Sequence, residues 1–514
     1  MSDNISQANN KRIAKNTLML YVRMIINMAV SLYTSRVVLE VLGVEDFGVY
    51  NVVGGIVGMF AFLNSTMSSS TSRFITFTLG EEDKEKLNST FNAALIIHIC
   101  IALLVIVIIE SIGLWFLYNK LVIPEARMNA AFWVLQLSVI TSFFSITQVP
   151  YNACIIAHEK IDLYAYIEIF HVLLKLIVVY VLIIGEIDKL ILYAILNLLV
   201  SVFIMFVYRI YCIRHFEESH FQLKTDKQIY KSMLTFSGWD LLGHFGYTFR
   251  YQGCNMVLNM FFGAIVNAAV GITSTVQGIL LQFSNNITMA VKPQIIKRYS
   301  VGNVSSMLNL VYSSIRLNLF MILLITIPIV IEIPYLLSLW LVDVPEYCAV
   351  FCQMALCANV LSSYSQVVYI AIQATGDLKQ TSINRNIIYV STPIVLYALY
   401  LWGFQIPTIT YVLLLLGQFI QSILDVNILK KKFPQLYISK LFFDFLKIFI
   451  IIILTSVLCH IVCFNISSGI YRLICVFVLS SSLLIILFTA FIFSLQERLY
   501  VKDLLLRFYE RIHN

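Results

Sequence analysis

The sequence predicts an all-α integral membrane protein of about 14 transmembrane helices, built as two parallel six-helix repeats followed by two further helices. Three observations lead to this prediction. The 514 residues are 60% hydrophobic and only 12% charged, which is far too apolar for a soluble domain. Apolar runs of about 20 residues, the length that crosses a bilayer, recur along the whole chain. Two sequence patterns also recur about 220 residues apart.

The predicted spanning helices are the segments whose length and hydropathy suit a bilayer. In chain order these are 17–39, 47–70, 91–118, 130–152, 161–184, 189–212, 234–261, 264–290, 305–330, 347–372, 383–403, 408–429, 441–463 and 469–494. A polar segment precedes them. A charged tail, residues 496–514, follows them and is expected to form an amphipathic helix at the membrane surface.

The basic residues predict the orientation in the membrane. With the N-terminus inside, 24 basic residues fall in inner segments and only 4 in outer segments, namely Lys120, Arg127, Lys189 and Arg472. The positive-inside rule therefore places both termini in the cytoplasm. No cleavable signal peptide is expected, because the first apolar run is too long and lacks a small-residue cleavage site.

An internal repeat supports the helix count. Gly43 corresponds to Gly263, and the pattern Gln-Val-x-Tyr-x-Ala occurs at 148–153 and again at 366–371. Six helices return the chain to the same side of the membrane, so the two copies are parallel repeats. We therefore expect an N-lobe of six helices, a C-lobe of six helices, and a final part with two helices and the cytoplasmic tail, at residues 1–215, 216–436 and 437–514.

Polar side chains recur at helical spacing inside several predicted helices. A charge at membrane depth costs roughly 2.5–3.5 kcal/mol, so such residues are expected to face a polar cavity rather than lipid. Ion pairing, or amides that join helices, is the structural alternative for each of them. The candidate substrate-binding residues are Arg23, Asn27, Arg36, Lys175, Arg250 and Arg316.

The sign of the intramembrane charge indicates the chemistry of the substrate. Cations outnumber the deep acids Glu168, Asp240 and Asp425. Guanidinium groups bind phosphates through two parallel hydrogen bonds, so the cavity suits a phosphate or diphosphate head group. A carboxylate and a histidine at helical spacing can take up a proton during transport. The candidates for ion or proton coupling are Glu168, His171, Asp240, His244 and Asp425.

No catalytic or metal-binding motif is apparent. The chain has no Walker loop, HExxH pattern or nucleophile elbow, so a transporter without a cofactor is expected rather than an enzyme. The driving force would be a proton or sodium gradient, the membrane potential or the substrate gradient. The ten cysteines lie in apolar segments without a CxxC or Cys/His ligand spacing, which favours packed thiols over a metal site. The net charge of +7 is not read as a signal for nucleic-acid binding.

Several stretches resemble the polysaccharide flippases of the multidrug/oligosaccharidyl-lipid/polysaccharide (MOP) exporter superfamily, whose MATE-like fold has the same helix count. The resemblance covers nearly the whole chain. The stretches that carry it are Ser70-Thr71-Ser72-Arg73-Phe74-Ile75 with Leu79-Gly80, Asn267-Ala268-Ala269-Val270-Gly271-Ile272, Gln277, Asn285-Asn286, Met289-Ala290 and Pro293-Gln294-Ile295-Ile296-Lys297.

The resemblance implies a multi-pass protein of the bacterial inner membrane that acts in O-antigen, capsule or lipopolysaccharide biosynthesis. It would move undecaprenyl-diphosphate-linked oligosaccharide from the cytoplasmic to the periplasmic leaflet by alternating access. A polysaccharide polymerase and glycosyltransferases are the implied protein partners. By position, Arg23, Arg36 and Arg250 are similar to the cationic residues that line such a cavity.

Four alternatives stay open at this point. A peptidoglycan lipid-precursor flippase would share the helix count and a cationic cavity. A MATE-like multidrug exporter fits less well, since those cavities tend to be acidic. A membrane polysaccharide polymerase or ligase needs a sizeable outer loop with reactive residues, whereas the longest outer loop, 332–346, holds no His, Arg or Lys. A structural scaffold would not account for so much intramembrane charge.

Overall fold

The structure is a computed structural model that describes residues 2–81, 83–158, 160–185, 187–222, 227–463, 466–495, 497 and 498. Within these ranges it does not describe the side chains of 2–24, 64–66, 69, 80, 161, 236–240, 242, 243, 286, 287, 289, 290, 293 and 463. The predicted amphipathic tail, 496–514, lies almost wholly outside the described residues.

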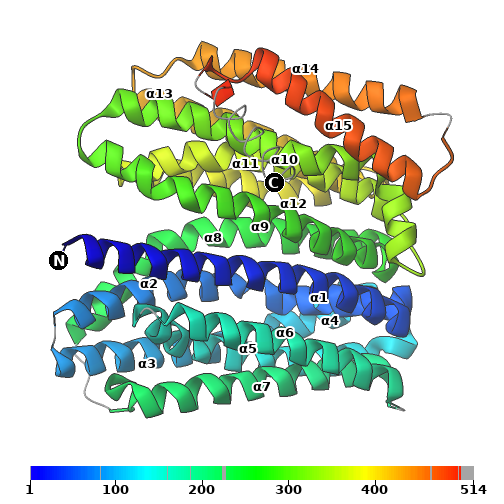
Figure 1. Cartoon of the computed structure of the whole chain (residues 1–514). Coiled ribbons are helices and arrows are strands. Elements are labelled where there is room, and N and C mark those ends of the chain that lie inside the picture. The colour runs from blue at the N-terminus through cyan, green and yellow to red at the C-terminus, as the bar shows by residue number, and fades with distance from the viewer. Residues whose placement is uncertain are drawn as a thin grey trace. The chain divides into compact units, whose positions relative to one another are not determined.

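The described residues form helices and short connections, with no strand among them (Figure 1). The α-helices are α1 (Ser2–Gly58), α2 (Ala61–Gly80), α3 (Lys84–Ile108), α4 (Leu114–Asn119), α5 (Met128–Ala157), α6 (Ile161–Ile184), α7 (Lys189–His215), α8 (Lys227–Phe262), α9 (Ala264–Ser300), α10 (Val304–Trp340), α11 (Cys348–Ala374), α12 (Lys379–Leu401), α13 (Ile409–Lys432), α14 (Ile438–Cys463) and α15 (Ile470–Phe491). A π turn η1 (Ile109–Gly113) and two 3-10 turns, η2 (Glu125–Arg127) and η3 (Glu217–Ser219), complete the list.

The predicted all-α membrane architecture is confirmed. All fourteen predicted segments are largely helical, although 47–70 is divided between α1 and α2 and 91–118 runs through α3, η1 and α4. Eleven helices among the described residues are long and apolar enough to cross a membrane. Helices are the expected solution because they satisfy every backbone hydrogen bond within one segment, which lipid cannot do.

Two glycines mark the equivalent break in each repeat. Gly43 interrupts α1 with φ of 77°, and Gly263 separates α8 from α9 with φ of 75°. Both angles lie in the left-handed region that glycine adopts without steric cost. The two glycines that the sequence pairs therefore adopt the same unusual conformation.

Helix boundaries repeat with a nearly constant offset. The starts of α3, α5, α6 and α7 precede those of α10, α11, α12 and α13 by 220, 220, 218 and 220 residues, respectively. Helices α14 and α15 follow the second copy and have no counterpart in the first. The structure thus contains the two predicted six-helix repeats and the two additional helices.

The chain packs into two compact units. Unit 1 consists of Met1–Thr275, Leu341–Cys348 and Arg385–Thr410, and unit 2 consists of Val276–Trp340, Ala349–Asn384 and Tyr411–Asn514. The predicted lobes divide the chain by its repeat, whereas these units divide it by packing. The lobe boundaries at residues 215 and 436 stay a prediction.

Each unit has its own apolar core. In unit 1, α5 lies against α2, α3 and α7 (Figure 1). There the buried ring of Phe91 meets that of Tyr151 edge to face, with centroids 5.2 Å apart. In unit 2, α15 packs against α10 and α14. Its Phe488 ring lies 5.2 Å from Phe320 and 5.7 Å from Phe493. Such aromatic clusters bury large apolar areas and stiffen the units that carry them.

A close helix crossing within unit 1 joins the second limb of α1 to the start of α9. A Cβ atom added at Gly48 would lie 1.8 Å from the carbonyl oxygen of Ala264, and one added at Gly271 would lie 2.0 Å from Nδ2 of Asn51. Small residues allow helix backbones to approach closely inside membranes. Glycine is therefore required at position 48 for space rather than for backbone conformation.

Replacement of Gly48 by alanine is expected to lower the free energy of unfolding by about 1–3 kcal/mol, the usual cost of overpacking. The thermal-unfolding midpoint of the purified protein in detergent measures the effect. Gly54→Ala is the matched control, because a Cβ atom at Gly54 meets no atom within 4 Å. Alanine is the better helix former, so the control midpoint should stay equal or rise. Equal midpoints for the two variants would contradict the crossing.

Candidate functional site

The candidate site is centred on Arg250, in the middle of α8. Its side chain is only 2% exposed. Its Nε and Nη1 atoms are buried and have no hydrogen-bond partner, and its Nη2 atom donates a long bond of 3.4 Å to the Tyr251 hydroxyl. Among the residues that the structure describes, no carboxylate pairs with this guanidinium. A buried cation without an anionic partner is costly, so its retention indicates a functional role.

Three tyrosine rings surround the Arg250 guanidinium, and we call this group the tyrosine cage. The Cζ atom lies 4.2 Å from the ring centroid of Tyr389, 5.0 Å from that of Tyr251 and 5.9 Å from that of Tyr247. Tyr247 and Tyr251 lie four residues apart and therefore on one face of α8, and Arg250, three residues after Tyr247, lies at the edge of that face. Cation–π contacts of this kind contribute about 0.5–2 kcal/mol and partly compensate for the missing anion.

Small residues on α8 bring the third tyrosine into range. A Cβ atom added at Gly246 would lie 2.4 Å from Oδ1 of Asn386, and one added at Gly253 would lie 3.1 Å from Cβ of Pro393. Both partners are on α12. Without side chains at these two positions, α12 can approach α8 closely enough for Tyr389 to cover the Arg250 guanidinium.

Two other arginines of the described residues, one in each unit, have two carboxylate partners each. In unit 2, Arg316 is 6% exposed, and its guanidinium donates to Oε1 of Glu497 at 2.8 Å and to Oδ2 of Asp444 at 3.4 Å. In unit 1, Arg127 bridges Asp46 and Asp188 with shortest distances of 2.6 Å to each. Of the two buried arginines in the part of the chain that the structure describes, Arg250 alone lacks an acidic partner.

Three asparagines near the junction of α8 and α9 hold the two helices together. Asn267 donates to Oδ1 of Asn255 at 2.7 Å and accepts from Asn259 at 2.8 Å. Asn259 in turn accepts from the backbone N–H of Val122 at 2.8 Å. All three amides are buried, and their bonds tie α8 to α9 across the Gly263 break. These asparagines therefore join helices, which the sequence left open as the alternative to lining a polar cavity.

Three further predicted substrate-binding residues of unit 1, namely Asn27, Arg36 and Lys175, are more accessible than Arg250. Arg36 and Lys175 are exposed, and Asn27 is half-buried with a buried Oδ1 that has no hydrogen-bond partner. The side chain of Arg23 lies outside the description. No hydrogen bond or ion pair joins Asn27, Arg36, Lys175 and Arg250 to one another, so their grouping in one cavity stays a prediction.

The predicted coupling residues lie on α6, α8 and α13. Glu168 accepts a bond of 3.2 Å from the Tyr208 hydroxyl, and the half-buried His171 follows it on α6. Asp425 is fully buried and accepts from Gln421 at 2.8 Å. His244 is exposed. The side chain of Asp240 lies outside the description, so the Asp240–His244 pair stays a prediction.

Amides on α9 and α11 join these two helices within unit 2. Gln277 donates to Oδ1 of Asn359 at 3.0 Å, and Asn359 returns a bond of 3.1 Å to the Gln277 carbonyl oxygen. Nearer the other end, Gln366 donates to Oδ1 of Asn285 at 2.6 Å. Gln277 and Asn285 of α9 therefore serve helix association.

The sequence did not indicate Tyr389, which makes the shortest ring contact with Arg250. Although Arg385 lies one turn before it on the same helix, one tyrosine among 28 has no distinguishing spacing. The signal that would have found it is the small-residue pattern of α8, because Gly246 and Gly253 lie seven residues apart and therefore on one helix face. A glycine face predicts a close neighbour, although it does not say which helix supplies it.

Comparisons with solved structures identify the fold. No protein-family model matches the chain, and no curated protein matches its sequence. The lipid II flippase MurJ, in an inward closed conformation, is 11% identical with a TM-score of 0.69, and the match covers 92% of this chain and 98% of that one. An inward-facing MATE family multidrug transporter of the MOP superfamily is 15% identical with a TM-score of 0.62, covering 80% and 98%. A MOP superfamily transporter from Pyrococcus furiosus, described as having a binding pocket of reverse polarity, is 14% identical with a TM-score of 0.60, covering 81% and 95%. The chain thus has the MATE-like fold that these membrane transporters share.

Proposed function

We propose that the chain is a flippase for undecaprenyl-diphosphate-linked oligosaccharide repeat units, such as those of O-antigen or capsule. It would move them from the cytoplasmic to the periplasmic leaflet by alternating access. The observation that carries the proposal is Arg250, a buried guanidinium that no carboxylate of the described residues pairs with, in a protein with the fold of membrane transporters. The similarity to MurJ, which is described as a lipid II flippase, supports a lipid-linked substrate.

The chemistry of the tyrosine cage suits a diphosphate. A guanidinium offers parallel N–H groups that match two phosphate oxygens, and the bonds strengthen where water is excluded. The neighbouring hydroxyl groups of Tyr247 and Tyr251 can donate further bonds to phosphate or sugar. The guanidinium is covered in this conformation, while the Tyr247 ring is 41% exposed. Substrate binding therefore requires this ring to swing aside, which an alternating-access cycle can supply.

A peptidoglycan lipid-precursor flippase is the second candidate. The match to MurJ covers 92% of this chain, whereas the matches to MATE transporters cover 80–82%. Both candidate substrates carry the same polyprenyl diphosphate and differ in the attached glycan or peptide. A cationic site at Arg250 serves either one. It is less suited to cationic drugs, which it would repel.

The same proposal places the protein in a bacterial inner membrane with both termini in the cytoplasm. The 24-to-4 distribution of basic residues supports this orientation. We keep Glu168, His171, Asp240, His244 and Asp425 as proposed coupling residues for a proton or sodium gradient. A polysaccharide polymerase and glycosyltransferases are the proposed partners, since they would consume and supply the substrate.

Transport of defined lipids into proteoliposomes tests the proposal. The purified protein is reconstituted with fluorescent undecaprenyl-diphosphate oligosaccharide, with a lipid II analogue, or with a neutral polyprenyl glycan that lacks the diphosphate. We expect rapid loss of leaflet asymmetry for the first substrate and none for the neutral lipid. Preference for the lipid II analogue would favour the second candidate. Equal rates for the neutral lipid, or no flipping of either diphosphate, would refute the proposal.

A further inference from the structure

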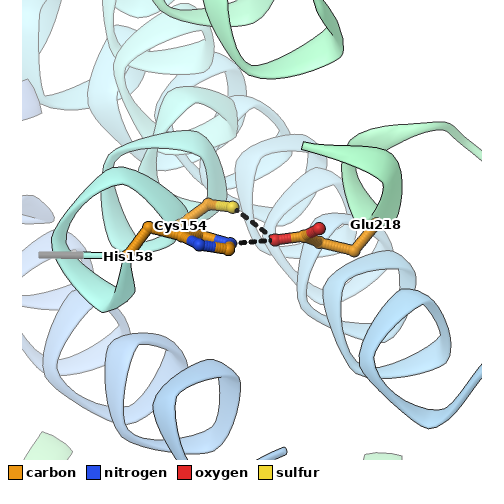
Figure 2. Close-up of side chains that lie close together, drawn as sticks. All are labelled: Cys154, His158 and Glu218. Atoms are coloured by element: carbon orange, nitrogen blue, oxygen red, sulfur yellow. Dashed lines mark hydrogen bonds and ion pairs between the residues drawn. The ribbon is translucent and has the colours of Figure 1, made fainter. Parts of the chain in front are cut away.

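A cysteine, a histidine and a glutamate of unit 1 converge where the C-terminal end of α5 meets η3 (Figure 2). Cys154 and His158 lie one turn apart at the C-terminal end of α5, and Glu218 comes from η3. Oε1 of Glu218 accepts a hydrogen bond of 2.6 Å from Nε2 of His158 and one of 3.2 Å from Sγ of Cys154. The three side chains therefore point at a common centre.

The surrounding structure holds this group in place. The His158 ring stacks on Phe216 with centroids 4.1 Å apart and an angle of 10° between the planes. Asn88 of α3 donates to the Glu218 backbone carbonyl at 2.9 Å, which fixes η3. Cys154 is fully buried and Glu218 is 6% exposed. The ligand atoms are thus largely fixed before any ion binds.

We infer that Cys154, His158 and Glu218 form a binding site for one Zn²⁺ ion. The three ligand atoms lie within 4.8 Å of one another. Tetrahedral zinc with bond lengths of about 2.0–2.3 Å places its ligands about 3.4 Å apart, so a small rotation of the Glu218 carboxylate completes the geometry. A thiolate, an imidazole and a carboxylate are a ligand set that suits Zn²⁺. The thiolate and carboxylate charges balance the ion, and the thiol proton leaves to solvent on binding.

The fourth coordination position faces a pocket. His158 and Glu218 form part of the lining of a cavity of about 680 Å³, which also includes Asn88 and His215. A water molecule from this cavity can occupy the open position, as in sites with three protein ligands. The bound ion would link the end of α5 to η3 and so hold the connection between α7 and α8.

This site differs from the sequence expectation of packed, metal-free thiols. Cys154 and His158 have the i, i+4 spacing of two ligands on one helix face. The third ligand lies 60 residues beyond His158, so no short motif contains all three. Only the folding of the chain brings Glu218 next to Cys154 and His158.

Metal titration of the full-length protein, purified without a histidine tag and stripped with a chelator, tests the site. We expect one Zn²⁺ per chain by elemental analysis, a higher thermal-unfolding midpoint with Zn²⁺, and a thiolate-to-metal absorption band when Co²⁺ is used as the probe. Cys154→Ala and Glu218→Gln should weaken binding by more than about 10- to 100-fold, the loss typical of removing a group that only orients a ligand.

The matched control is Cys254→Ala, which removes a buried thiol on α8 that is not part of the ligand set. It should retain one Zn²⁺ and the Co²⁺ band. His158→Phe keeps a ring to stack on Phe216 while removing the ligand nitrogen, so it separates metal loss from loss of packing. Absence of stoichiometric metal in the unaltered protein, or unchanged binding in both Cys154→Ala and His158→Phe, would overturn the inference.

Discussion

Replacement of Arg250 by glutamine is expected to slow flipping of a diphosphate-linked glycan by about 10- to 150-fold while leaving the protein folded. Hydrogen bonds to a charged group contribute about 1.5–3 kcal/mol, and each 1.4 kcal/mol corresponds to a factor of ten. Stability should change by no more than about 1 kcal/mol. The variant loses the free energy of the cation–π contacts, but it no longer bears the cost of burying a charge without an acidic partner, and the two changes offset each other. Initial flipping rates in proteoliposomes and thermal-unfolding midpoints measure the two effects.

Conservative variants around Arg250 separate charge from geometry. Arg250→Lys keeps the positive charge but loses the planar fork, so it should fall between the unaltered protein and Arg250→Gln. Tyr389→Phe keeps the ring on the guanidinium and should fold and bind lipid nearly normally. Normal flipping by Arg250→Gln would exclude Arg250 as the anion site. Severe destabilisation by the same variant would show instead that the guanidinium has a structural role.

Replacement of Arg316 by methionine is expected to have the opposite profile, with a large loss of stability. Removing one member of a buried ion pair typically costs 3–5 kcal/mol, because the remaining charges stay buried and unpaired. The side chains of Asp444 and Glu497 are 19% and 21% exposed, so we expect about 3 kcal/mol, the lower end of that range. The thermal-unfolding midpoint should fall clearly. Lys431→Met, which removes an exposed cation of unit 2, is the control and should have little effect.

The pH dependence gives a second test of the Arg316 network. Burial raises the pKa of the Glu497 carboxyl, but the hydrogen bond from Arg316 and other bonds outweigh burial, and the net pKa is lowered. A carboxyl whose pKa is lowered on folding stabilises the protein above its unfolded pKa of about 4.3, and this contribution is lost as the pH falls further. In Arg316→Met the carboxylates of Asp444 and Glu497 have no cationic partner, so their protonation at low pH stabilises the folded variant. The stability gap between the two proteins should therefore narrow below about pH 4.

Charge-neutral partners should rescue the Arg316 variant. Adding Asp444→Asn and Glu497→Gln to Arg316→Met removes the unpaired charges, and most of the lost stability should return. If the triple variant is as unstable as Arg316→Met alone, packing rather than charge explains the loss. A midpoint for Arg316→Met equal to that of Lys431→Met would show that the observed ion pairs contribute nothing.

Helix positions and the repeat could be predicted from the sequence because the lipid environment restricts the backbone so strongly. A chain in hydrocarbon must satisfy its own hydrogen bonds, so each apolar run of sufficient length becomes a helix. The pairing of Gly43 with Gly263 was visible from their common offset, and both adopt a left-handed φ. The split of the second predicted segment between α1 and α2 was not predicted, although Gly58 lies directly before the break and glycine is common at helix ends.

The role of each intramembrane charge could not be predicted in the same way. Arg250 and Arg316 look alike in the sequence, since each is a single arginine within a long apolar helix with polar neighbours. The partners of Arg316 lie 128 and 181 positions away along the chain. Arg250 meets Tyr389 from another helix and, among the described residues, no carboxylate.

The sequence by itself determined that this chain crosses the membrane many times, that its helices form two copies of one arrangement, and that cations prevail among its intramembrane charges. Those properties depend on local composition and spacing, which the bilayer converts directly into helices. Only the tertiary structure decided which of the two buried arginines has no acidic partner among the described residues, and which thiol meets a histidine and a carboxylate. Such encounters depend on side chains from distant helices, and the packing of those helices, rather than any local pattern, brings them together.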